Sequence, residues 1–111
     1  MNDISPEARE NITQLQIMEQ RLQSLMMQKQ SFQTQMFEVE SALKETKDLK
    51  GDAFRIIGPI MISSNLTDIK KDLESKKEMF DLRLKSIEKQ EKKIKEEASE
   101  LQEKVMKELG Q

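Results

Sequence analysis

The segment AFRIIGPIMIS, residues 53–63, decides the fold of this 111-residue chain. Isoleucine dominates the segment and Gly58-Pro59 interrupts it at the centre, a pattern that predicts a β-hairpin. Because successive side chains of a strand point to opposite faces, both faces of this hairpin should be mainly apolar. The expected faces are Phe54 and Ile56 opposite Arg55 and Ile57 on the first arm, and Ile60 and Ile62 opposite Met61 on the second. A hairpin in water would have one polar face, so this one needs cover on both sides.

Rough energies indicate where that cover comes from. Ordering about 11 residues costs on the order of 15 kcal/mol, and six large apolar side chains return roughly 9–18 kcal/mol only when they are fully buried. An isolated hairpin is marginal in water, so we expect this one to pair with strands of other chains. A tight apolar plug between two helices is the alternative, although a simple helix–helix turn needs only a few residues. The candidate assembly residues are Phe54, Ile56, Ile57, Gly58, Pro59, Ile60, Met61 and Ile62.

Upstream of the hairpin, the sequence predicts a helix over residues 6–50. Ser5 can cap it, Pro6 suits the first helical position and Glu7 favours the positive end of the helix dipole. Apolar residues then recur at alternating steps of three and four, as in the a/d seam of a coiled coil, and Lys29 is the only charged member. The expected seam is Leu15, Met18, Leu22, Leu25, Lys29, Phe32, Met36, Val39 and Leu43.

Downstream, a second helix is predicted over residues 65–109. Asn65 or Ser64 can cap it, Asp68 is placed as in a capping box, and Gly110 suits the C-terminal end. Its apolar seam residues, all but one on a seven-residue step, are Leu66, Ile69, Leu73, Phe80, Ile87, Ile94 and Leu101. The alternate seam positions are expected at Lys76, Arg83, Gln90, Glu97 and Lys104, with Leu84, Ala98 and Val105 beside the strip. The second seam should therefore be the narrower one.

Two helices of matched length around a connection of about 15 residues imply an antiparallel coiled coil. The predicted fold class is mainly α, and residues 1–111 are expected to form a single domain with its hairpin at 53–63. The composition agrees, with 36% charged and only 4% aromatic residues, as in long helices packed along narrow seams. Disorder is the alternative for so polar a chain, but the periodic apolar residues favour the coiled coil.

The composition also argues against several functions. The sequence has no His and no Cys, so the usual general bases, thiol nucleophiles and soft-metal ligands are missing, and we expect neither an enzyme nor a cofactor or metal site. Acidic and basic residues are interleaved and the net charge is −2, which does not favour nucleic-acid binding. No segment predicts a membrane span or a signal peptide, so a soluble cytoplasmic protein is expected.

Two stretches carry a resemblance to a known family. One is the hairpin, through Phe54, Arg55, Gly58 and Ile60–Ile62, and the other is LESKKEMFDLRLKSIEKQEKKIKE, residues 73–96. In these stretches, and in its order of helix, short hairpin and helix, the chain resembles β-class prefoldin subunits over essentially its whole length. The α class of that family has two hairpins, whereas the connection here has room for one.

The resemblance implies a prefoldin-type domain whose hairpin joins an intersubunit β-barrel, in a hexamer of two α and four β subunits. It also implies an ATP-independent chaperone subunit, a holdase, that binds unfolded polypeptides at the coiled-coil tips and delivers them to a group II chaperonin. A structural coiled-coil adaptor or tether without chaperone activity is the alternative.

The two chain ends are expected to meet at the free end of the coiled coil. Ile4, Ile12 and Met106 lie off the predicted seam there, so a two-helix seam does not explain them. Methionine suits weak contacts without sequence preference, because it is unbranched and polarizable. The alternative is that Ile12 and Val105 simply widen the coiled-coil core. The candidate client-binding tip is Ile4, Ile12, Val105, Met106 and Leu109.

Overall fold

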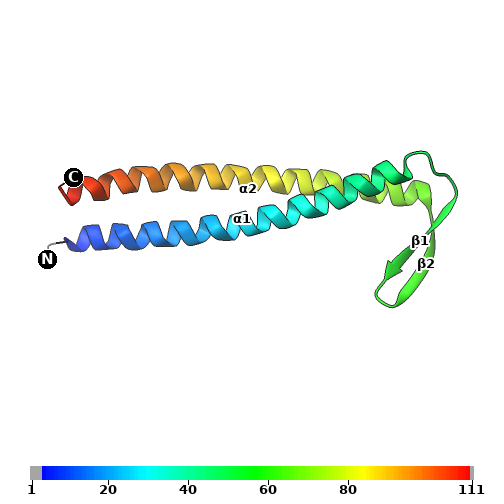
Figure 1. Cartoon of the computed structure of the whole chain (residues 1–111), viewed down its shortest axis with the longest axis horizontal. Coiled ribbons are helices and arrows are strands. Elements are labelled where there is room, and N and C mark those ends of the chain that lie inside the picture. The colour runs from blue at the N-terminus through cyan, green and yellow to red at the C-terminus, as the bar shows by residue number, and fades with distance from the viewer. Residues whose placement is uncertain (1–3, 111) are drawn as a thin grey trace. The chain divides into compact units, whose positions relative to one another are not determined.

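A computed structural model describes residues 4–110 of the chain. Its elements follow the order α1 (Pro6–Thr46), β1 (Asp52–Ile57), β2 (Ile60–Asn65) and α2 (Leu66–Glu108), as Figure 1 shows. The chain divides into two compact units, the terminal unit (Met1–Gln30 with Lys85–Gln111) and the hairpin unit (Ser31–Leu84). Each helix therefore contributes one segment to each unit. The predicted fold class, two long helices joined by a short antiparallel hairpin, is confirmed.

In the terminal unit, the segments of α1 and α2 run antiparallel. Lys29 Nζ lies 3.2 Å from Glu91 Oε1, while Asn11 Nδ2 donates to Glu108 Oε1 at 3.5 Å. The earlier residue of α1 thus contacts the later residue of α2, as antiparallel helices require. The buried apolar side chains of this unit include Ala8, Leu25, Ile87 and Val105.

The hairpin unit contains a second antiparallel helix pair and the two strands. The rings of Phe32 and Phe80 lie 5.9 Å apart between centroids, and the guanidinium of Arg83 lies 5.8 Å from the Phe32 centroid. Lys70 Nζ donates to the main-chain carbonyls of Lys47 at 3.3 Å and of Leu49 at 2.9 Å. These two residues follow the end of α1, so their carbonyl groups have no helical partner, and Lys70 satisfies them.

The first helix begins at the predicted position 6, and the second begins at position 66, one residue after its predicted start. Ser5 Oγ accepts a hydrogen bond from the Ala8 amide at 3.0 Å, and α1 starts at Pro6. Asn65 Oδ1 accepts from the Thr67 amide at 2.7 Å, and α2 starts one residue after Asn65. Each cap satisfies one amide of a first helical turn.

The first helix ends at Thr46, four residues before the expected position 50. After Thr46 the backbone forms three-residue turns, in which the Lys47 amide donates to Lys44 and the Leu49 amide to Thr46, and Lys70 holds the carbonyls of Lys47 and Leu49. Gly51 then has φ of 105°, a left-handed conformation that favours glycine, and its carbonyl accepts from the Leu66 amide at 2.9 Å. These contacts close the base of the hairpin, and they depend on α2, which local sequence does not reveal.

Replacing Asn65 by alanine is expected to lower the free energy of unfolding by about 1 kcal/mol, since the Thr67 amide loses its acceptor. Urea unfolding followed by circular dichroism measures the change. Serine at position 65 can still cap, so Asn65→Ser should retain most of the stability. Equal losses for the two variants would contradict the capping role.

The seam of α1 is confirmed, because none of its nine predicted members is exposed. In α2 the seven predicted apolar members are also buried or half-buried, but all five expected alternate positions are exposed. The residues one position later, Lys77, Leu84, Glu91, Ala98 and Val105, are buried or half-buried instead. The prediction of the alternate positions was therefore wrong. From Leu73 the seam advances by four residues and then three, so Leu84, Ala98 and Val105 belong to the seam and do not flank it.

Candidate functional site

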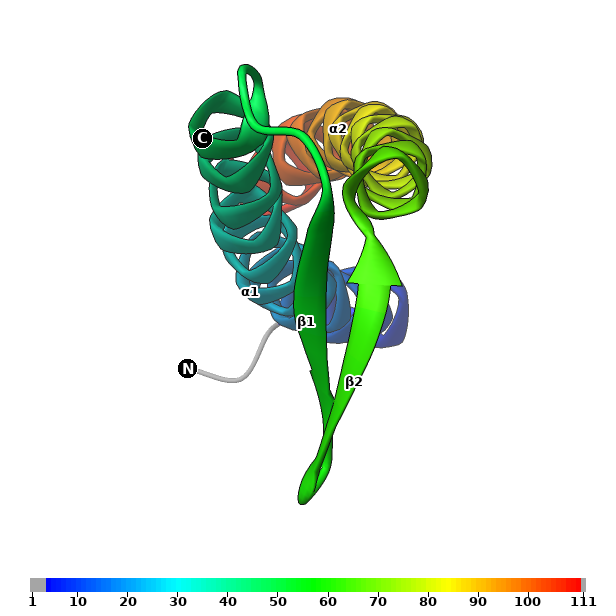
Figure 2. The same ribbon diagram turned by 90° about the vertical axis from the view of Figure 1, so that its right-hand side faces the viewer.

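The hairpin is a tight antiparallel pair with a two-residue turn. Ile57 pairs with Ile60, so only Gly58 and Pro59 lie between the strands. Gly58 has φ of 57°, and proline fixes its own φ near −65°. This is the combination required at the two central positions of a type II′ turn, whose twist matches that of the flanking strands. Figure 2 shows the two strands as a twisted ribbon that extends away from the helix ends of the hairpin unit.

Both hairpin faces are apolar and exposed, as the alternation along the strands predicts. Phe54 and Ile56 share a face with Met61, the cross-strand partner of Ile56, while Ile57 pairs with Ile60 on the other face. All six large apolar side chains of the hairpin are exposed: Phe54, Ile56, Ile57, Ile60, Met61 and Ile62. The alternative of an apolar plug between the helices is therefore wrong.

One face of the hairpin lies against α2 of the same chain. The guanidinium of Arg55 forms an ion pair with the carboxylate of Asp72. Beside this pair, a groove of about 300 Å³ is lined from β1 by Ile57 and from α2 by Ile69 and Leu73, among others. From the opposite face of the hairpin, Ile56 also lines this groove, whereas Phe54 and Met61 do not. The Arg55–Asp72 pair was not predicted, because it joins residues 17 positions apart in the sequence.

The edges of the hairpin are also open. Within residues 4–110 the sheet consists of β1 and β2 alone, so each strand has one edge without a neighbouring strand. The N–H and C=O groups along such an edge can pair with a strand of another chain. The hairpin thus offers both apolar faces and backbone edges for assembly.

The predicted client-binding tip lies in the terminal unit, but its five residues differ in exposure. The beginning of α1 lies near the end of α2, where Lys104 Nζ is 3.4 Å from Glu7 Oε1. Met106 and Leu109 are exposed, and Ile4 and Ile12 are half-buried. Val105 is only 6% exposed. It therefore packs in the coiled-coil seam, in agreement with the alternative that this residue belongs to the core and not to a client-binding surface. The surface available at this end is smaller than the sequence suggests.

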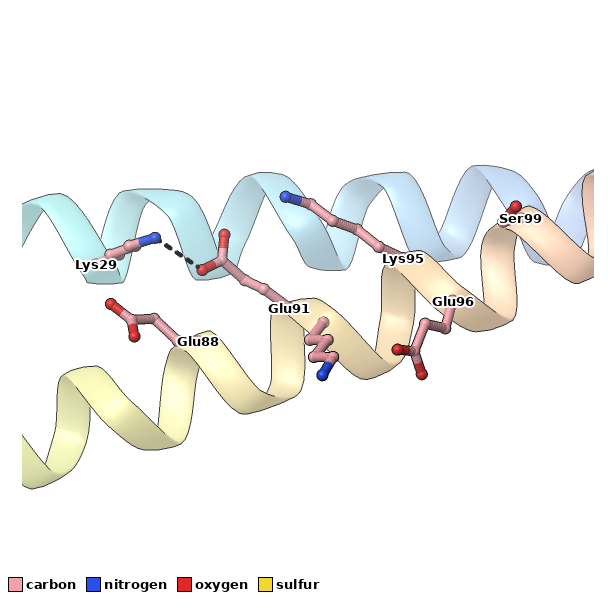
Figure 3. Close-up of a pocket in the computed structure, with 7 residues that line it drawn as sticks. Lys29, Glu88, Glu91, Lys95, Glu96 and Ser99 are labelled. Atoms are coloured by element: carbon pink, nitrogen blue, oxygen red, sulfur yellow. Dashed lines mark hydrogen bonds and ion pairs between the residues drawn. The ribbon is translucent and has the colours of Figure 1, made fainter.

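An ion pair interrupts the apolar seam of the terminal unit. Glu91 is 8% exposed and accepts a hydrogen bond from Lys29 at 3.2 Å. Figure 3 shows the two side chains pointing toward each other from the facing helices, with the carboxylate of Glu88 directed toward the same lysine. These residues border a polar groove of about 480 Å³. Lys29 was predicted to lie in the seam, but its partner was missed because the seam of α2 was placed one residue too early.

Two other kinds of site are absent from residues 4–110. Among them, no three or more His, Cys, Asp or Glu side chains are grouped so that they can hold a metal ion. Neither α1 nor α2 combines the length and apolar character that a membrane span requires. The hairpin and the tip are the two surfaces that the sequence singled out.

A comparison with protein families identifies the chain. The family model described as prefoldin subunit matches residues 9–111. The chain belongs to the prefoldin family. Prefoldin subunits are chaperones that assemble with one another, so membership gives this chain a chaperone role within an assembly of prefoldin subunits.

Individual prefoldin subunits are similar along nearly the whole chain. Prefoldin subunit beta of Methanococcoides burtonii is 35% identical over 111 residues, which cover 98% of this chain and 95% of that protein. The same subunit of Caldivirga maquilingensis is 31% identical over 105 residues, covering 93% and 87%. The crystal structure of the prefoldin beta subunit from Thermococcus strain KS-1 matches with a TM-score of 0.86 at 28% identity, covering 96% of each chain. The predicted β class is confirmed.

Proposed function

We propose that this chain is an ATP-independent holdase subunit that acts in the cytoplasm. It joins a hexamer of two α-class and four β-class prefoldin subunits through its hairpin. It binds unfolded polypeptides at the tip of its coiled coil and passes them to a group II chaperonin. The single observation that carries the proposal is the hairpin, whose six large apolar side chains are all exposed in the isolated chain.

The hairpin makes the contacts with other subunits, through the candidate assembly residues between Phe54 and Ile62. Left in water, exposed apolar faces and open strand edges favour aggregation. Strands from neighbouring subunits remove both problems, because they pair with the edges and close the sheet into a barrel. The face with Arg55 already lies against α2. We therefore assign the opposite face, with Phe54, Ile56 and Met61, to the interior of that barrel.

Co-expression with a two-hairpin α-class subunit tests the assembly. Native mass measurement should find a hexamer only when both subunits are present. An aggregation assay by light scattering, with an unfolded client and no nucleotide, should then show suppression. A stable homodimer without holdase activity would favour the structural adaptor.

The client-binding tip can be tested without disturbing the seam. Serine at positions 4, 12, 106 and 109 removes the exposed or half-buried isoleucine, methionine and leucine side chains and leaves Val105 in place. The hexamer should form normally, but about threefold more of it should be needed to suppress aggregation, since weak apolar contacts to the client are lost. A control with Met79→Ser and Leu82→Ser, two exposed apolar residues of the hairpin unit, should behave like the wild type. Full suppression by the tip variant would remove these residues from the site.

A further inference from the structure

The middle of α1 is almost free of charge. Residues 22–37, LQSLMMQKQSFQTQMF, include a single charged residue, Lys29, in a chain where charged residues make up 36%. The corresponding surface of α2 is different: the sequence KSIEKQEKKIKEE, residues 85–97, alternates lysine and glutamate along its length. Both segments are helical and, apart from the half-buried Gln35, exposed outside their seams. The difference in charge is therefore a difference between two surfaces.

The one charge in this part of α1 does not face outward. Lys29 occupies a seam position and is paired with Glu91, as described above. Its charge is therefore neutralised between the helices. Within the terminal unit, the outward side of α1 carries only uncharged side chains over this stretch, and Met27 is 71% exposed. We call this surface the neutral face; it consists of Gln23, Ser24, Met26, Met27, Gln28 and Gln30.

We propose that the neutral face is a second contact surface for unfolded polypeptides and accepts segments of either charge sign. The proposal rests on the holdase function proposed above. An unfolded chain presents apolar side chains together with backbone N–H and C=O groups. Flexible, polarizable methionine can fit varied apolar side chains, and each glutamine amide can both donate to and accept from a backbone. A surface without charge repels neither acidic nor basic segments.

The size of the neutral face favours this occupant over a folded partner. Two partly exposed methionines offer roughly 200 Å² of apolar surface, whereas a stable protein–protein interface buries about 800 Å² per partner. A helix docking in a groove also needs apolar anchors that repeat every three or four residues. On the neutral face the neighbours of Met26 and Met27 at those steps are all polar: Gln23, Ser24 and Gln30. Weak contacts of this kind suit a client that is held briefly and released.

Charge-sign selectivity gives a test that a merely structural role would not pass. The protein is the wild-type or variant chain assembled with an α-class subunit. The probes are labelled acidic carboxymethylated α-lactalbumin and labelled basic reduced lysozyme, and their affinities are measured by fluorescence anisotropy. Gln23→Glu with Met27→Glu should weaken binding of the acidic client about fivefold and that of the basic client less. Gln23→Lys with Met27→Lys should reverse this preference.

Matched controls place the same change of net charge on α2. Lys89→Gln with Lys93→Gln changes the charge by −2, and Glu96→Gln with Glu103→Gln changes it by +2; all four residues are exposed. Both controls should leave both affinities within about twofold of wild type. The neutral face is ruled out as a client surface when its variants keep the wild-type ratio of affinities, or when the controls shift that ratio equally. A wild-type assembly that binds neither client instead overturns the holdase function, and the neutral face with it.

Discussion

Replacing Ile56 and Met61 together by serine is expected to abolish assembly while leaving both helices formed. These cross-strand partners lie on the face assigned to the barrel interior. They are 73% and 63% exposed in the isolated chain, so their loss removes little burial from the chain itself. In an assembly each would contribute roughly 1.5–3 kcal/mol, and the loss recurs at every copy of the hairpin. Association should weaken at least about a hundredfold per hairpin contact.

Sizing of the co-expressed subunits measures this result, with circular dichroism as the test of helix content. Phe37→Ser with Leu82→Ser is the matched control, because these side chains are 70% and 67% exposed but lie on helices of the hairpin unit. The control should assemble. A hexamer formed by the Ile56 and Met61 variant would contradict the role of this face, and assembly failure in both variants would mean that loss of exposed apolar surface, wherever it lies, is the cause.

The parts of the fold that local chemistry determines could be predicted from the sequence. Ser5 and Asn65 cap the two helices as expected because a cap acts within three residues of itself. The two hairpin faces followed from alternation along each strand, and their register was fixed by the short Gly58-Pro59 turn. The sequence also favoured exposure of these faces in the isolated chain over a plug between the helices, because a simple helix–helix turn needs only a few residues.

The features that were predicted wrongly depend on contacts between α1 and α2. In α2 the later candidate is apolar at three of the alternate positions, Leu84, Ala98 and Val105, and these three already indicate the later register. Only where both candidates are polar, as with Gln90 and Glu91, does the position itself give no reason to choose the second. Lys29 on the other helix supplies that reason, because it provides Glu91 with a partner. Counting the seam in steps of four and then three would have found Glu91. The same error left Val105 in the predicted tip, although it is a seam residue.

The end of α1 was missed for a related reason. No Gly or Pro interrupts the sequence between Thr46 and Lys50, so local propensity extends the helix to position 50. In the structure the Lys47 amide donates to the Lys44 carbonyl, three residues back and not four, and Lys70 of α2 binds the carbonyls of Lys47 and Leu49 in the segment that follows. Helix ends set by such long-range bonds cannot be located from propensity alone.

The buried pair of Lys29 and Glu91 leads to a prediction in which one substitution destabilises and a second reverses the loss. Glu91→Leu should lower the free energy of unfolding by about 2 kcal/mol, since the lysine amine loses its partner within the seam. The value is below that for a fully enclosed pair because the Lys29 side chain is 29% exposed and Glu88 is directed toward it (Figure 3). Urea unfolding of the isolated chain measures the change.

Adding Lys29→Leu to Glu91→Leu should restore wild-type stability or exceed it by about 1–4 kcal/mol, because two leucines fill a seam that is apolar on either side without desolvating charge. The exchanged pair, Lys29→Glu with Glu91→Lys, keeps both charges and serves as the control, with stability close to wild type. If Glu91→Leu alone is as stable as the wild type, the lysine does not depend on this carboxylate. The result would be contradicted if the double leucine variant were less stable than the wild type, Glu91→Leu and the exchanged pair. The ion pair would then stabilise the chain more than two packed leucines do.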